Sequence, residues 1–81
     1  MSRQLEIQIP KMGMDTTEVQ IGRWLIKVGD SVSVGTPLVE LESEKAVFTV
    51  ESEAAGIVTE IRQVSGRTVS IGEVLCIVNP D

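Results

Sequence analysis

Apolar and polar residues alternate with a period of two along most of this 81-residue chain. Leu5, Ile7 and Ile9, for example, are separated by Glu6 and Gln8, which is typical of a strand with one buried face. Similar short runs, separated by turns rich in Gly, Ser and Asp, cover residues 18–26, 31–34, 37–42, 46–51, 56–62, 68–71 and 73–78. The pattern predicts an all-β domain of about eight short strands, and no segment has the apolar spacing of an amphipathic helix.

The chain also contains an internal repeat with an offset of 37 residues, in which VSVGTPLV (32–39) lies over VSIGEVLC (69–76). The same offset places Val58 on Ile21 and Ile61 on Trp24. Both apolar pairs are three residues apart, so the alternation slips once in each copy. One β-bulge in each copy would explain this slip.

Toward the N-terminus the offset grows to 41, which aligns Ile9 with Val50. On this alignment the first copy is four residues longer, within 11–17, and we interpret the difference as a loop extension. Two similar four-stranded halves predict a small sandwich or flattened barrel with an approximate two-fold axis. The counterpart of Lys45 would fall just beyond the last residue, so Lys45 is expected at the end opposite the chain termini.

Composition and charge exclude several classes of function. Seven Lys and Arg against twelve Asp and Glu give a net charge of −5, which disfavours nucleic acid and anionic membrane as partners. The chain has no His and one Cys, which argues against a His-based catalytic site, a disulfide framework and a Cys-cluster metal site. A chain this short is not expected to enclose a substrate cleft. Trp24, Phe48 and Cys76 are predicted core residues.

One short connection is a candidate for function. The segment ESEKA (42–46) joins the expected strands 38–41 and 47–50, and Lys45 is the only basic residue between positions 40 and 53. On composition alone, a lysine in a polar hairpin is usually a solubility residue. The alternative is an attachment point, because an amine at the tip of a rigid hairpin is open to an approaching enzyme.

The segment resembles the lipoylation motif of lipoyl domains, with Glu44 where that family usually has Asp. Three further features support the resemblance: the spacing from Lys45 to Gly56, the turns VGDSV (28–32) and GTPL (35–38), and the opening IPKMGM (9–14). This opening is similar to lipoyl domains in pyruvate- and acetoin-dehydrogenase-type acyltransferase (E2) subunits. The resemblance covers residues 5–78. It implies the family's all-β fold, a flattened barrel or sandwich of two four-stranded antiparallel sheets with pseudo-two-fold symmetry, which agrees with the repeat.

The resemblance implies that Lys45 carries an amide-linked lipoyl group and that the domain is a carrier, not an enzyme. This swinging arm would move acyl groups and reducing equivalents between the E1 decarboxylase, the E2 catalytic domain and the E3 flavoprotein of a 2-oxo acid or acetoin dehydrogenase complex. A lipoate ligase or lipoyl transferase would attach the lipoate. The implied recognition residues are Glu42, Ser43, Glu44 and Ala46 in the hairpin and Met12, Gly13, Met14 and Asp15 in the loop extension.

Several expectations and alternatives accompany this interpretation. The domain is expected to span residues 1–79, with 80–81 starting a linker, and to be monomeric in the bacterial cytoplasm or a mitochondrial matrix. A biotin carrier is the main alternative, although Met usually flanks the lysine of biotinyl domains, and here the flanks are Glu44 and Ala46. A lipoyl domain of a dihydrolipoyl dehydrogenase and an unmodified β-sandwich adaptor are the others.

Overall fold

The computed structural model describes residues 4–10, 17–44 and 46–80. In these residues the predicted alternation forms eight strands, and the all-β prediction is confirmed. The strands are β1 (Leu5–Gln8), β2 (Glu18–Trp24), β3 (Ser31–Val32), β4 (Pro37–Glu42), β5 (Val47–Glu51), β6 (Gly56–Ile61), β7 (Thr68–Ser70) and β8 (Val74–Asn79). No helix among the described residues is long and apolar enough to cross a membrane.

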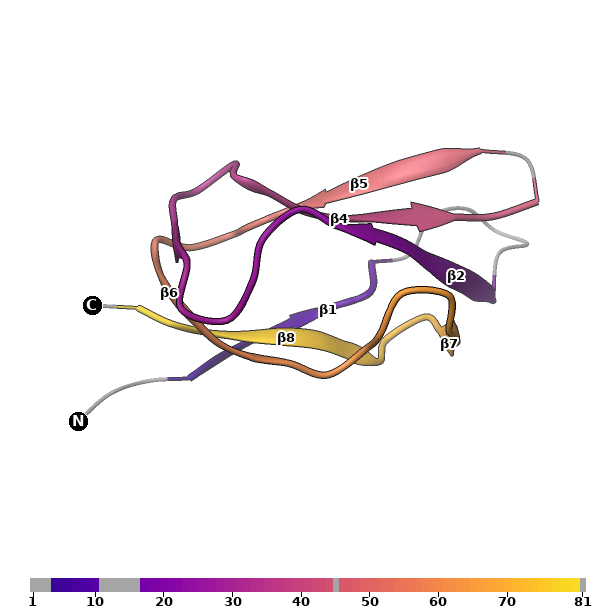
Figure 1. The fold of residues 1–81 in the computed structure, drawn as a ribbon. Helices are drawn as coiled ribbons and strands as arrows, with labels where there is room; N and C mark the ends of the chain where they lie inside the picture. Colours follow the sequence, from indigo (N-terminus) through magenta and orange to yellow (C-terminus); the bar gives the residue numbers. More distant parts are fainter. Residues whose placement is uncertain (1–3, 11–16, 45, 81) are drawn as a thin grey trace.

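The strands form two four-stranded antiparallel sheets that face each other (Figure 1). The first sheet has the order β1-β8-β6-β3, and the second has the order β5-β4-β2-β7. The 37-residue offset relates β2 to β6, β3 to β7 and β4 to β8, so the strand order of one sheet maps onto that of the other. The pseudo-two-fold symmetry is therefore confirmed, and each sheet contains two strands from each half of the chain.

Both predicted β-bulges are present at equivalent places. The register of β2 against β4 shifts between Ile21 and Trp24, and that of β6 against β8 shifts between Val58 and Glu60. Each bulge lets two apolar side chains that are three residues apart face the same core. The slip in the sequence pattern thus had a structural cause in both halves.

The predicted alignment at the N-terminus, in contrast, is wrong by two residues. Ile7 pairs with Cys76, and Val50 pairs with Val39, the repeat counterpart of Cys76. The counterpart of Val50 is therefore Ile7 and not Ile9, so the offset in this strand is 43 and not 41. The first copy is accordingly six residues longer than the second, not four.

The counterpart of Ile9 is a polar residue, Ser52, which explains the error. The amide of Ile9 donates to the carbonyl of Glu73, and that of Ser52 donates to the carbonyl of Thr36, which is the repeat counterpart of Glu73. Ser52 is only 3% exposed, and its hydroxyl donates to the carbonyl of Ala54 at 2.6 Å. A buried serine with its hydrogen bond satisfied can occupy a core position, so matching apolar residues alone misaligned the two copies.

The core lies between the two sheets. Its buried members are aliphatic residues and one cysteine: Ile7, Ile9, Val19, Ile21, Val32, Leu38, Val39, Leu41, Val50, Val58, Val69, Leu75, Cys76 and Val78. Trp24 packs against this cluster and donates from Nε1 to the carbonyl of Gln63 at 2.7 Å. Phe48 is half-buried and lies outside the cluster, so its predicted core role is wrong. Phe48 lies on β5, which is an edge strand, so it has a neighbouring strand on one side only.

The chain ends and the β4–β5 hairpin lie at opposite ends of the molecule. In Figure 1 the N- and C-termini are at the left, and the end of β4 and start of β5 extend to the right. The longest dimension of the molecule is 39 Å. The two strands that flank Lys45 therefore point away from the termini, as the repeat predicted, although Lys45 itself lies outside the described residues.

Close backbone contact at Gly56 gives a test of this fold. A Cβ at Gly56 would collide with the carbonyl oxygen of Asn79 and come within 2.8 Å of the Pro80 Cα. We expect Gly56→Ala to lower the free energy of unfolding by about 2–3 kcal/mol, because rigid backbone must move. The measurement is urea-induced unfolding. Ala55→Ser, an added atom at an exposed neighbouring position, should change stability by less than about 0.5 kcal/mol. Equal stability of the two variants would contradict the expectation.

Candidate functional site

The tip of the β4–β5 hairpin brings four of the predicted site residues together. Glu42, the last residue of β4, pairs with Val47, the first residue of β5. Beyond this pair the chain turns through Ser43, Glu44 and Ala46, with Lys45 between the last two. The antiparallel pairing of β4 and β5 thus places the predicted attachment motif at the end of a two-stranded projection.

Hydrogen bonds between Ser43 and Ala46 close the turn. The Ser43 amide donates to the Ala46 carbonyl at 2.9 Å. The Ser43 hydroxyl donates to the same carbonyl at 3.2 Å, and it also accepts from the Ala46 amide at 3.2 Å. The residues immediately before and after the Glu44–Lys45 pair are therefore tied to each other by backbone and side chain.

A surface groove of about 560 Å³ lies beside this tip, on the second sheet. Val47, Glu42, Gln20 and Thr68 form one row across its four strands, because the register pairs Val47 with Glu42, Glu42 with Gln20 and Gln20 with Thr68. The described lining consists of this row together with neighbours on β2 and in the tip: Glu18, Val19, Ser43, Glu44 and Ala46. The groove is thus continuous with the hairpin that contains Lys45.

The described lining of the groove is acidic and partly apolar. It contains three carboxylates, from Glu18, Glu42 and Glu44, and no basic residue. Val47 is 61% exposed and adds an apolar rim beside Ala46. The lining provides no His, Cys or Lys as a nucleophile or base. Nor do the described residues contain a cluster of His, Cys, Asp and Glu that could hold a metal ion. The described lining thus combines three carboxylates with an exposed apolar side chain.

The predicted site residues thus divide into two groups. Glu42, Ser43, Glu44 and Ala46 lie together at the tip. Met12, Gly13, Met14, Asp15 and Lys45 lie outside the described residues, so their predicted roles stay predictions.

Sequence reasoning missed the groove residues Glu18, Gln20, Val47 and Thr68. Their only sequence signal is their place on the outward-facing positions of three strands. That signal becomes useful only when it is known that β2 pairs with both β4 and β7.

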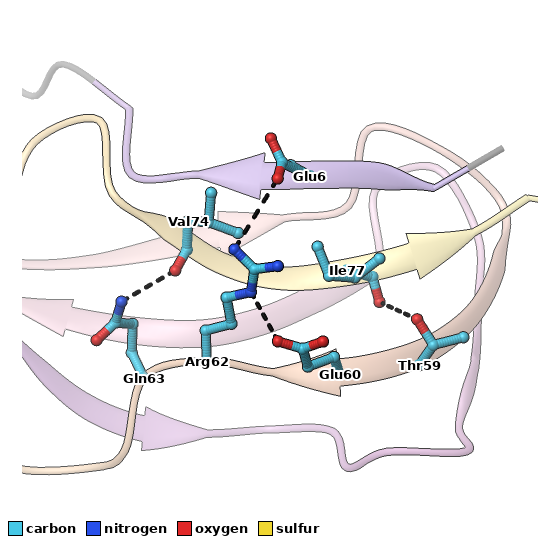
Figure 2. Close-up of polar contacts among 7 residues, drawn as sticks. All are labelled: Glu6, Thr59, Glu60, Arg62, Gln63, Val74 and Ile77. Carbon is cyan, nitrogen blue, oxygen red and sulfur yellow. Dashed lines mark hydrogen bonds and ion pairs between the residues drawn. The ribbon is translucent and has the colours of Figure 1, made fainter.

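A separate ionic cluster lies on the first sheet (Figure 2). Arg62 Nε donates to Glu60 at 2.6 Å, and its Nη1 lies 4.0 Å from Glu6. The hydrogen bond and charge of Glu60, with a smaller contribution from Glu6, raise the pKa of the Arg62 guanidinium. The register places Glu6 and Glu60 on either side of Ile77, which is 2% exposed although it lies outside the central core cluster. The cluster thus covers an apolar side chain on the sheet's outer face and is not part of the hairpin site.

Comparisons with known proteins agree with this architecture. The family model described as biotin-requiring enzymes (biotin/lipoyl) matches residues 5–78. The chain is 40% identical over 73 residues to the dihydrolipoyllysine-residue succinyltransferase of the 2-oxoglutarate dehydrogenase complex of Staphylococcus saprophyticus. The matched region is 90% of this chain but 17% of that protein. It is 36% identical over 72 residues to the corresponding acetyltransferase of the pyruvate dehydrogenase complex of Corynebacterium glutamicum, of which it covers 11%.

Two solved structures share the fold. The lipoyl domain of the 2-oxoglutarate dehydrogenase complex from Azotobacter vinelandii has a TM-score of 0.74 and 29% identity, over 94% of this chain and 95% of that one. A multi-domain long-chain acyl-CoA carboxylase has a TM-score of 0.81 and 15% identity, over 96% of this chain and 7% of that one, a likeness of fold alone.

The chain belongs to the biotin/lipoyl attachment family. Within that family, the relatives place it with the lipoyl domains of the acyltransferase (E2) components of 2-oxo acid dehydrogenase complexes. It spans less than a fifth of the length of the two acyltransferases described.

The buried free cysteine, Cys76, gives a pH test of the core between the two sheets. Burial raises the pKa of the Cys76 thiol from 9.0 to about 11. The unfolded chain therefore ionises its thiol at lower pH than the folded chain, so stability is full below pH 9 and falls as pH rises toward 11. In urea unfolding under reducing conditions, the parent should lose stability over this range relative to Cys76→Val, which copies its repeat counterpart Val39. Parallel pH profiles would contradict the burial argument.

Proposed function

We propose that this chain is a lipoyl carrier domain whose Lys45 is joined to lipoate through an amide. The observation that carries the proposal is the projecting β4–β5 hairpin, closed by Ser43 and Ala46 on either side of the Glu44–Lys45 pair. Glu44 and Ala46, the residues on either side of Lys45, are both exposed. The tip therefore has room for an attached lipoyl group. Membership of a family that includes lipoyl domains supports the same residue.

When bound, the lipoyl group would supply a disulfide that accepts an acyl group together with two electrons. The residues of the chain hold and present the modified lysine. The paired strands β4 and β5 keep its attachment point at one end of the domain. Amide formation removes the positive charge of Lys45, so the acidic tip formed with Glu42 and Glu44 becomes more negative. A covalent tether replaces free diffusion with a raised effective concentration near each partner.

The partners follow from the same proposal. A lipoate ligase or lipoyl transferase would modify Lys45, and the arm would then visit the E1 decarboxylase, the E2 catalytic domain and the E3 flavoprotein of the parent complex. The substrate, a 2-oxo acid or acetoin, would be selected by E1, because the carrier receives only the acyl group. We propose that this takes place in the bacterial cytoplasm, or in the mitochondrial matrix for a eukaryotic source. The span of the domain (1–79) and its monomeric state stay predictions.

The first test is the site of attachment. After incubation with a lipoate ligase, ATP and lipoate, peptide mapping should find the adduct on Lys45 and on neither Lys11 nor Lys27. Lys45→Ala should stay folded by circular dichroism and gain no mass. A biotin ligase should leave the parent unmodified, because Glu44 and Ala46 replace the methionines that usually flank a biotinylated lysine. Modification of Lys11 or Lys27 in the variant, or biotin on Lys45, would contradict the proposal.

The second test concerns the longer connection between β1 and β2. The first half of the chain is six residues longer here than the second half. These six residues have no counterpart in the second copy, so the symmetry of the fold does not require them. We propose that Met12, Gly13, Met14 and Asp15 contact E1, since connections carry function more often than the strands they join. Deleting 12–15 should lower the rate of reductive acylation by the cognate E1 by about tenfold or more, while lipoylation continues.

The control for this deletion is the lipoylated parent at the same concentration, with folding of both proteins checked by circular dichroism. An unchanged acylation rate would mean that E1 selects the domain through other residues, such as the acidic hairpin.

A further inference from the structure

The hairpin tip lacks the backbone conformation that usually stabilises so short a connection. Only Glu44 and Lys45 lie between the bonded residues Ser43 and Ala46. Two-residue hairpins favour turns whose first central residue has positive φ, because these turns match the right-handed twist of the strands. Glu44 is the first central residue here, and no described residue other than glycine has positive φ. Another interaction must therefore hold this tip.

The Ser43 hydroxyl supplies that interaction. It accepts a hydrogen bond from the Ala46 amide at 3.2 Å and donates one to the Ala46 carbonyl at 3.2 Å, beside the backbone bond of 2.9 Å. The hydroxyl thus binds both polar backbone groups of the residue that follows Lys45. Alanine at position 43 would lose both hydroxyl bonds to Ala46 and keep the backbone bond, whereas threonine has a hydroxyl on the same carbon.

We propose that Ser43 is a positioning residue for the attachment of lipoate. Its hydroxyl holds the tip in the conformation in which the ligase accepts Lys45, and it acts through the hairpin and not by contact with the ligase. This inference rests on the proposed function and refines the role of Ser43, which the resemblance alone implied to be a recognition residue.

The mechanism predicts a particular kinetic signature. The two hydroxyl bonds are long, at 3.2 Å, and their combined loss shifts a local conformational equilibrium by roughly fivefold. If the ligase binds only the held conformation, its apparent KM for the domain rises by up to the same factor, because KM varies inversely with the population of that conformation. The kcat stays unchanged, because at a saturating concentration of the domain every ligase molecule still binds the competent conformation. A general loss of folding would raise KM in the same way, so the folded fraction of each variant must also be measured, by circular dichroism.

The experiment compares initial rates of lipoylation, measured by intact mass over a range of domain concentrations, for the full chain and three variants. Ser43→Ala should raise KM by up to about fivefold at unchanged kcat, and Ser43→Thr should restore the parent value. The matched control is Thr36→Val. Thr36 Oγ1 accepts from the Ser33 amide at 2.9 Å in the turn before β4, at the end of that strand remote from Lys45. This variant should behave like the parent.

Amide hydrogen exchange provides a second measurement that needs no ligase. The Ala46 amide should exchange about fivefold faster in Ser43→Ala than in the parent or in Ser43→Thr. A parent-like KM in Ser43→Ala, or failure of Ser43→Thr to restore it, would overturn the positioning role. A parent that gains no lipoate on Lys45 would overturn the proposed function and this role with it, whereas a kinetic failure confined to the Ser43 variants would leave the proposed function intact.

Discussion

The structure depends on the way in which the two halves of the chain complete each other's sheets. The Gly29 amide donates to the Val58 carbonyl at 2.8 Å, and the symmetry-related Gly66 amide donates to the Ile21 carbonyl at 2.7 Å. Each bond joins a turn in one half to a strand in the other half. Both glycines have positive φ, near +99° and +89°, which residues with a Cβ rarely adopt. Because each sheet takes two strands from each half, neither half has a complete sheet or core without the other.

This interlocking also determines the two ends of the molecule. At one end, β4 runs directly into β5, and the tip between them contains Lys45. At the symmetry-related end, β8 and β1 are neighbours in the first sheet, but there the chain begins and ends (Figure 1). In the proposed function, a group attached to Lys45 would lie at the end of the barrel opposite to the start of β1 and the end of β8. The barrel separates them along its longest dimension of 39 Å.

Much of the fold could be predicted from particular residues. The paired spacings Ile21/Trp24 and Val58/Ile61 predicted both bulges, because the same slip occurred twice. The same reasoning failed where the two copies differ in chemistry. Ser52 occupies a buried position that its counterpart Ile9 fills with an apolar side chain, so a match of apolar residues moved the alignment by two. The groove could not be predicted either, because its row of residues on four strands exists only through long-range pairing.

The amino-acid sequence by itself determined the strand pattern, the repeat, the family and the motif around Lys45, because each is a local pattern or a repetition of one. Tertiary structure decided which strands are neighbours, and hence that Glu42, Gln20 and Thr68 share one outer surface. It also decided the geometry of Ser43. A serine in a polar hairpin is compatible with contact to solvent, to a ligase or to its own backbone. Only the antiparallel approach of β4 and β5 brings its hydroxyl within hydrogen-bond distance of both polar backbone groups of Ala46.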